Sequence, residues 1–84
     1  MNIPFKPDGF KDTPCYQIRW WRGYGWIHLE AGQEDKMGNW HRFITIHAKL
    51  PSRLHEGFRW RMVKSLMGLC SQAEKEVGLD VFRV

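Results

Sequence analysis

Residues 16–31 read YQIRWWRGYGWIHLEA and contain the clearest strand pattern of the chain. Two runs of alternating apolar and polar side chains meet at a glycine-rich centre, and alternation with a period of two is typical of half-buried β-strands. A two-residue loop of type II′ favours glycine at its first position, so Gly23 and Tyr24 are predicted to form the loop. The stretch is therefore predicted to be a β-hairpin in which Trp21 lies opposite Trp26.

This register sorts the hairpin side chains into two faces, because opposite residues of neighbouring strands point to the same side of a sheet. The apolar face, which is expected to meet the core, consists of Tyr16, Ile18, Trp20, Ile27, Leu29 and Ala31. The other face, called the open face below, carries Gln17, Arg19, Trp21, Trp26, His28 and Glu30. A loop of odd length would pair Ile18 with Glu30, so the two-residue loop is favoured.

The whole chain has 84 residues, of which 43% are hydrophobic and 26% charged, and its formal net charge is +4. This length is that of one domain, and the composition is that of a folded globular protein. No apolar run approaches the roughly 18 residues of a membrane span, and the N-terminus lacks the apolar core of a signal peptide. We therefore expect a cytoplasmic protein, with a positive charge that mildly favours polyanionic partners.

Residues 1–14 contain Pro4, Pro7 and Pro14 and are predicted to be an N-terminal arm that forms neither a helix nor a central strand. Residues 15–84 are predicted to be a single α+β domain. Ile3, Phe5 and Phe10 are the arm residues expected to pin it across the domain, where Phe5 and Phe10 could cover the open face.

Residues 40–50 are predicted to be a third strand, since Ile44, Thr45 and Ile46 favour β structure. Strict alternation along this strand places one set toward the core, namely Trp40, Arg42, Ile44, Ile46 and Ala48. It adds the other set to the open face, namely His41, Phe43, Thr45, His47 and Lys49.

Residues 52–77 are predicted to be a helix, with Ser52 as its N-cap and Gly78 as its C-cap. The apolar stripe expected to lie on the sheet consists of Phe58, Met62, Leu66, Leu69, Ala73 and Val77, widened by Val63 and Cys70. Residues 79–84 are predicted to be a short C-terminal strand at a sheet edge. The predicted fold is thus α+β, with a three-stranded antiparallel sheet, one long helix on one face and a short final strand.

Two surfaces are candidates for binding. The first is the N-terminal half of the helix, where clustered cations run against the helix dipole: Arg53, Arg59, Arg61 and Lys64. The second is the open sheet face with its aromatic rings and cations, represented by Arg19, Trp21, Trp26 and His28, together with Arg42. Each surface also has a simpler interpretation. The helix cations could form an ordinary solvated face, and the N-terminal arm could cover the open sheet face.

The predicted function is non-catalytic binding of nucleic acid, either DNA or RNA, through these residues. The alternative is a small stoichiometric inhibitor or adaptor that binds a nucleic-acid-handling protein, of the kind that viruses and mobile elements encode in short genes, because exposed Trp and Arg are also typical of protein interfaces. A metal-independent ribonuclease using His28, Glu30, Arg19 and His41 is a further alternative. No cofactor or metal is expected, since His41 and His47 lie about 20 Å apart on an extended strand.

Overall fold

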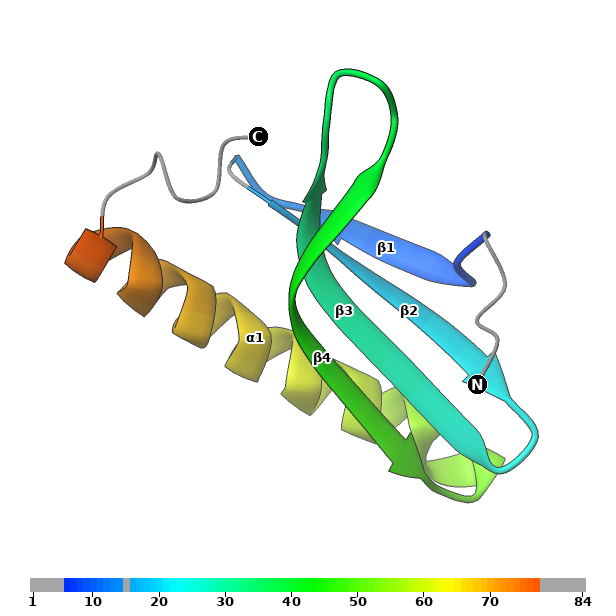
Figure 1. The fold of residues 1–84 in the computed structure, drawn as a ribbon. Helices are drawn as coiled ribbons and strands as arrows, with labels where there is room; N and C mark the ends of the chain where they lie inside the picture. The colour runs from blue at the N-terminus through cyan, green and yellow to red at the C-terminus, as the bar shows by residue number, and fades with distance from the viewer. Residues whose placement is uncertain (1–5, 15, 78–84) are drawn as a thin grey trace.

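The computed structural model describes residues 6–14 and 16–77, and for residues 72–77 it describes the backbone alone. Its elements are β1 (Gly9–Asp12), β2 (Gln17–Gly23), β3 (Trp26–Glu34), β4 (Trp40–Lys49), a 3₁₀ turn η1 (Ser52–Leu54) and α1 (His55–Val77). The strands form one antiparallel sheet in the order β1-β2-β3-β4, and α1 runs along one of its faces (Figure 1). The predicted α+β class is confirmed, but in the described part of the chain the sheet has four strands, where a three-stranded sheet was predicted before the helix.

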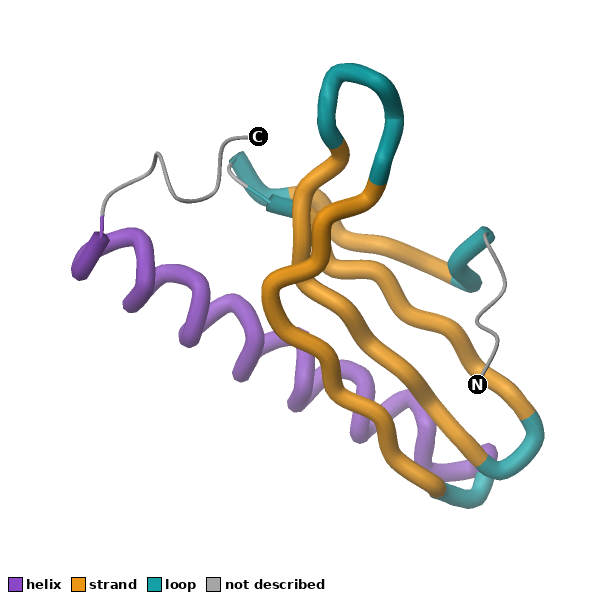
Figure 2. The backbone as a smooth tube through the Cα atoms, in the orientation of Figure 1, coloured by secondary structure: helices purple, strands orange, loops and turns teal. Residues whose placement is uncertain are grey.

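The additional strand, β1, comes from the segment predicted to be an N-terminal arm. Within the described residues it pairs with β2 alone and lies at the sheet edge, where segments flanked by proline are tolerated (Figure 2). Phe10, in this strand, is 57% exposed and therefore anchors nothing in the core. The predicted roles of Ile3 and Phe5, the Gly78 cap and the final strand at 79–84 lie outside the described residues.

The hairpin loop consists of Tyr24 and Gly25, so the predicted loop was wrong by one position. Gly25 has a φ of 80°, as the second loop residue of a type II turn requires. Gly23 has a different purpose, because a Cβ added there would lie 1.9 Å from the Trp26 ring. The pairing between β2 and β3 is displaced by two residues relative to the prediction, and an even displacement preserves the predicted division into two faces.

The core lies between the apolar sheet face and α1. Its buried residues are Tyr16, Ile18, Ile27, Leu29, Ala31, Val63, Leu66 and Cys70. Leu69 was predicted to belong to this stripe but is 52% exposed. A helix turns by about 100° per residue, so Leu69 is rotated away from the sheet when Leu66 and Cys70 face it.

A β-bulge in β4 reverses the predicted orientation of its first residues. Ala31 pairs with Ile44, whereas Gly32 pairs with Arg42, so Phe43 is the extra residue. An extra residue inverts the alternation of side chains that precede it. As a result Trp40 and Arg42 point to the open face and Phe43 packs against the core, which is the opposite of the prediction.

Gly32 permits the close approach of β4 at this bulge. A Cβ added to Gly32 would lie 2.3 Å from the backbone oxygen of His41 and 2.8 Å from the Cα of Arg42. Backbone atoms of a paired strand cannot move aside as a flexible side chain can. The bulge therefore depends on the absence of a side chain at position 32.

The start of α1 differs from the predicted serine cap. Ser52 is the first residue of η1, and the N-cap position is Pro51, which makes no side-chain hydrogen bond. His55 is buried, and its Nε2 lies 3.1 Å from the carbonyl oxygen of Leu50. This contact joins the beginning of the helix to the end of β4. Within the described part of the chain, no helix combines the length and the apolar character needed to cross a membrane.

Candidate functional site

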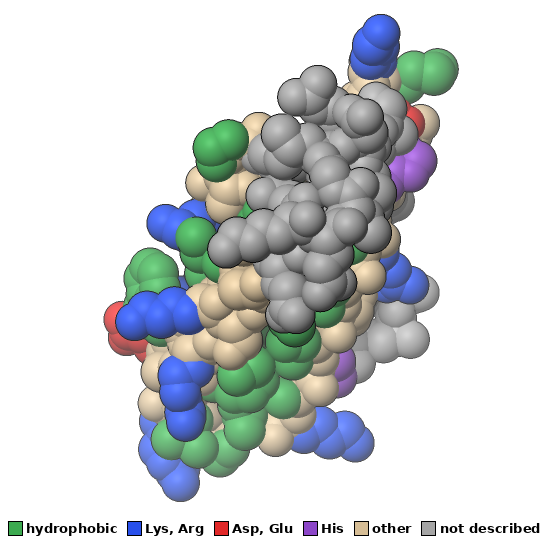
Figure 3. All heavy atoms as spheres, turned by 90° about the vertical axis from the view of Figure 1, so that its left-hand side faces the viewer, with side chains coloured by type: hydrophobic (Ala, Val, Ile, Leu, Met, Phe, Trp, Pro, Cys, Tyr) green, Lys and Arg blue, Asp and Glu red, His purple; other side chains and the backbone are tan. Residues whose placement is uncertain are grey.

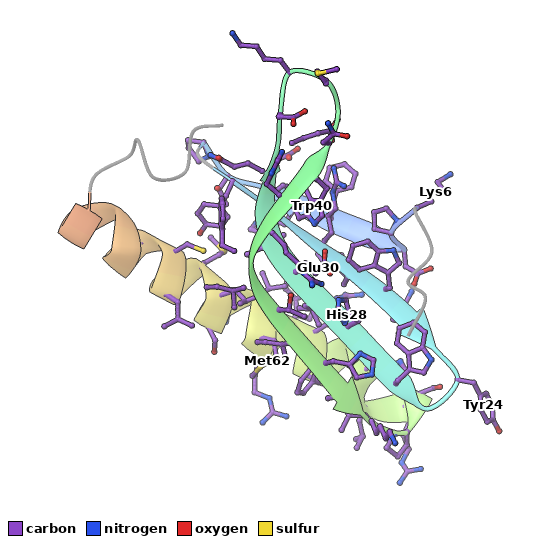
Figure 4. The ribbon with its side chains drawn as sticks, viewed as in Figure 1. Lys6, Tyr24, His28, Glu30, Trp40 and Met62 are labelled. Atoms are coloured by element: carbon purple, nitrogen blue, oxygen red, sulfur yellow. The ribbon has the colours of Figure 1, made fainter. Side chains whose placement is uncertain are left out.

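The open face of the sheet has a buried carboxylate at its centre. Glu30 is 5% exposed; its Oε1 accepts a hydrogen bond of 2.7 Å from Trp40 Nε1, and its Oε2 lies 2.8 Å from His28 Nε2 and 3.3 Å from Arg42 Nη1. Figure 4 shows Trp40, Glu30 and His28 following one another along the sheet. Burial raises the pKa of Glu30, but the hydrogen bonds from His28, Trp40 and Arg42 outweigh it and lower the pKa overall.

A cross-strand histidine pair continues this network toward solvent. His28 and His47 are opposite each other on β3 and β4, and their Nδ1 atoms are 3.1 Å apart. A carboxylate only accepts hydrogen bonds, so His28 Nε2 carries a proton toward Glu30. When both rings are neutral, His47 Nδ1 therefore donates to the bare Nδ1 of His28. The exposed His47 ring stacks on the Trp26 ring, with 5.7 Å between the ring centroids and an interplanar angle of 21°.

Arg19 is engaged by three neighbours on the same face. Its guanidinium lies 4.0 Å from the centroid of the Trp40 ring, its Nη2 donates to Glu34 Oε2 at 2.7 Å, and its Nε donates to Gln17 Oε1 at 2.6 Å. A hollow of about 420 Å³ beside this residue is lined by Lys6, Pro7, Phe10, Gln17 and Arg19. The guanidinium of Arg19 is thus already paired with a carboxylate.

His41 is likewise paired with an acid, Asp35, in the β3–β4 loop. Its Nε2 lies 2.7 Å from Asp35 Oδ2. This hydrogen bond, together with those from the backbone N–H groups of Asn39 and Met37, lowers the pKa of Asp35 to about 2. Because the bulge turns Trp40 and Arg42 to the open face, His41 between them points to the opposite face, so its predicted place on the open face was wrong. Since Arg42 contacts Glu30, both arginines of the open face, Arg19 and Arg42, have acidic partners within the sheet.

Two residues predicted to contact a partner through the open face are buried. Trp21 is 4% exposed and His28 is 5% exposed, and their rings pack edge to face at 5.7 Å. Among the described residues, no acceptor reaches the Nε1 atom of Trp21. These two side chains support the open face from within. Trp26, which is partly exposed, remains at the surface.

The cations of η1 and α1 have a different electrostatic setting. Arg53, Arg61 and Lys64 are exposed. Among the described residues, neither these three nor Arg59 has a carboxylate oxygen within the 4.0 Å of an ion pair. Arg61 and Lys64 are three residues apart on α1, so they lie about 60° apart around its axis, and Arg53 precedes them in η1. We call these three the basic stripe.

Exposed apolar side chains accompany the basic stripe. Leu54 is 48% exposed, Trp60 is 46% exposed and Leu69 is 52% exposed. Figure 3 shows blue Lys and Arg side chains along one edge of the molecule, beside green hydrophobic ones. Arg59 differs from the stripe, because it is only partly exposed and its guanidinium contacts the rings of Trp20 and Trp60.

The structure thus separates the nine predicted site residues into two groups on different surfaces. Those of the open face, Arg19, Trp21, Trp26, His28 and Arg42, belong to or adjoin the network around Glu30. Those of the helix, Arg53, Arg59, Arg61 and Lys64, make no ion pair among the described residues. The sequence predicted His47 on the open face, but not that it would lie opposite His28. Trp40 was predicted to face the core, and its place beside Glu30 depends on the bulge at Phe43, for which the alternation along residues 40–50 gives no signal.

Comparison of the chain with protein-family models, curated proteins and solved structures found no match in any of the three. The described residues contain no group of three or more His, Cys, Asp or Glu side chains arranged to hold a metal ion.

Proposed function

We propose that the protein is a non-catalytic nucleic-acid-binding protein that holds phosphates with the basic stripe and Arg59. The observation that carries this proposal is the contrast in ion pairing. The arginines of the open face have carboxylate partners, whereas the helix cations have none among the described residues. A cation that already has an acidic partner offers less to an incoming phosphate than one that has none.

The arrangement of the helix cations has an energetic cost in the isolated protein. Arg53 lies just before the first turn of α1, where a cation opposes the macrodipole, and the like charges of Arg61 and Lys64, three residues apart on the helix, repel each other. Arg53, Arg61 and Lys64 are exposed, so this cost is reduced by solvent. A row of phosphates would reverse the sign of both effects, because it brings negative charge to the same place.

Arginine is well suited to this task. Its planar guanidinium donates two parallel hydrogen bonds to phosphate oxygens, while lysine acts as a compact point charge. The stripe extends over about 16 Å of chain, taking 1.5 Å per residue between positions 53 and 64. This length fits several consecutive phosphates better than one isolated anion. The cytoplasm is the location that such a function implies.

The proposal is tested by fluorescence anisotropy with labelled single-stranded and duplex oligonucleotides at 50 and 200 mM salt. Four phosphate contacts, those of the basic stripe and Arg59, predict that the association constant falls by about 50- to 150-fold between these salt concentrations. A variant with Arg53, Arg61 and Lys64 all changed to Gln should lose most of this dependence. The control variant changes the exposed Lys6, Lys11 and Lys36 to Gln, which removes the same charge elsewhere. Equal effects of the two variants, or no binding by the wild type at 50 mM salt, would exclude the proposal.

A second candidate is a stoichiometric inhibitor or adaptor that binds a nucleic-acid-processing protein. The observation that favours it is the exposure of Leu54, Trp60 and Leu69 on the same segment, since half-exposed apolar residues are typical of protein interfaces. Binding of this kind should persist at 200 mM salt. It should be lost in a Leu54→Ser, Leu69→Ser variant that retains the cations, whereas phosphate-driven binding should not.

A further inference from the structure

The side chain of Arg59 contacts two indole rings at once. Its guanidinium carbon lies 5.1 Å from the centroid of the Trp20 ring and 5.0 Å from that of the Trp60 ring. Trp20 in turn packs closely over β1, because a Cβ added to Gly9 would lie 2.5 Å from its ring. Trp20 is partly buried against the core, whereas Trp60 is 46% exposed. Arg59 thus connects an anchored indole with a surface indole.

Arg59 has hydrogen-bonding capacity that the described residues do not use. Its Nε is buried and meets no acceptor among them, and no carboxylate there forms an ion pair with it. A guanidinium carries five N–H donors in one plane. Contacts with ring faces attract its charge but accept none of these hydrogen bonds in the plane. The donors at the edge of the guanidinium therefore suit an anion that arrives next to Trp60.

We propose that Trp60 and Arg59 form a nucleotide site, in which an unpaired base stacks on the exposed Trp60 indole and a neighbouring phosphate binds Arg59. The protein would then prefer single-stranded to duplex nucleic acid. This inference rests on the proposed function. The basic stripe alone gives no such preference, because phosphate contacts are made with either form.

The preference for single strands follows from the accessibility of the bases. In a duplex, the bases stack on one another and their faces are covered, whereas unpaired bases can stack on aromatic side chains. Trp60 is positioned for this by its contact with Arg59, which reduces the ordering required on binding. An acidic protein segment could pair with Arg59 and with the cations at positions 53, 61 and 64, but its carboxylates supply no flat base to stack on the exposed Trp60 ring. A nucleic acid strand accounts for both the ring and the row of cations.

The test measures binding of wild-type protein and of Trp60→Ala to a 12-nucleotide single strand and to the duplex of the same sequence, at 50 mM salt. Loss of one stacked base predicts that Trp60→Ala weakens single-strand binding by about 5- to 150-fold and leaves duplex binding within about twofold. Trp60→Phe, which retains an aromatic ring, should keep most of the affinity. Arg59→Lys, which retains the charge but not the planar donors, should weaken single-strand binding. Far-UV circular dichroism confirms that each variant is folded.

Each other outcome overturns a specific part of the inference. Unchanged single-strand binding in Trp60→Ala, while the stripe variant loses affinity for both forms, would remove the stacking site and leave the proposed function standing. Equal losses for single strand and duplex would show that Trp60 does not select unpaired bases. Displacement of the strand by poly-glutamate at equal charge concentration, with the same dependence on Trp60, would assign the site to an acidic protein segment. Absence of binding to either form would remove both proposals together.

Discussion

Replacement of Glu30 by Gln should destabilise the protein more than any other single removal of an acid from the open face. The carboxylate is 5% exposed and has three hydrogen-bonding partners, Trp40, His28 and Arg42. The amide oxygen of Gln can replace one acceptor, but its NH₂ group then faces another donor. Breaking a buried charged network of this kind costs about 3 to 5 kcal/mol. For 84 residues the total stability is on the order of 4 to 12 kcal/mol, so the loss is a large part of it.

The matched control for this variant is Glu34→Gln, on the same strand and the same face. Glu34 also pairs with an arginine, Arg19, but its side chain is 52% exposed, so the expected loss is under about 1 kcal/mol. Urea denaturation of wild type and both variants, followed by far-UV circular dichroism, measures the difference. If the free energies of unfolding of Glu30→Gln and Glu34→Gln differ by less than about 1 kcal/mol, the network around Glu30 does not stabilise the fold as described.

Three further predictions concern acid sensitivity and two glycines. The lowered pKa values of Glu30 and Asp35 mean that each carboxylate stabilises the fold above its ordinary pKa and loses this effect as the pH falls, for Asp35 between 3.8 and about 2. Thermal melts from pH 7 to pH 2 should show falling stability below about pH 4, and Asp35→Asn should flatten the lower part of this curve. Gly32→Ala should destabilise by at least about 1 to 3 kcal/mol in urea denaturation, because the new Cβ meets the backbone of β4. Gly68→Ala should stabilise by up to about 1 kcal/mol in the same assay, since the space around this helical glycine is open and alanine is the better helix former.

The division of the hairpin into two faces was predictable from the sequence, whereas its loop was not. Alternation of apolar and polar residues shows which side chains share a face, but not which residues are paired across the strands. A displacement of the pairing by two residues leaves every side chain on the same face. Gly23 and Gly25 both suit a tight loop. The deciding contact is that of the Trp26 ring with Gly23, which no local pattern displays.

The bulge in β4 could not be predicted from alternation along residues 40–50. Phe43 and Ile44 are both apolar neighbours, so the sequence does not show which of them begins the core-facing series. The close approach at Gly32 settles this point through a contact between two strands. The consequence is large, because the bulge brings Trp40 and Arg42 to Glu30 and so creates the network of the open face.

The helix cations were identifiable from the sequence, but their electrostatic setting was not. The sequence shows that Arg53, Arg61 and Lys64 lie close together in a segment with an excess of positive charge. Whether a cation has an acidic partner depends on side chains from other elements, as the pairing of Arg19 with Glu34 shows. The comparison of the two surfaces therefore required the structure, and it narrowed the proposed phosphate contacts from both surfaces to the helix.

Mapping the bound surface by NMR distinguishes the helix from the open sheet face as the part of the protein that contacts nucleic acid. Uniformly ¹⁵N-labelled protein is titrated with a single-stranded oligonucleotide at 50 mM salt, and backbone amide shifts are followed by two-dimensional NMR. We expect the largest shifts in residues 53–64, with residues 40–49 of β4 little changed. Shifts concentrated on β4 and on Trp26, with residues 53–64 unaffected, would contradict this prediction.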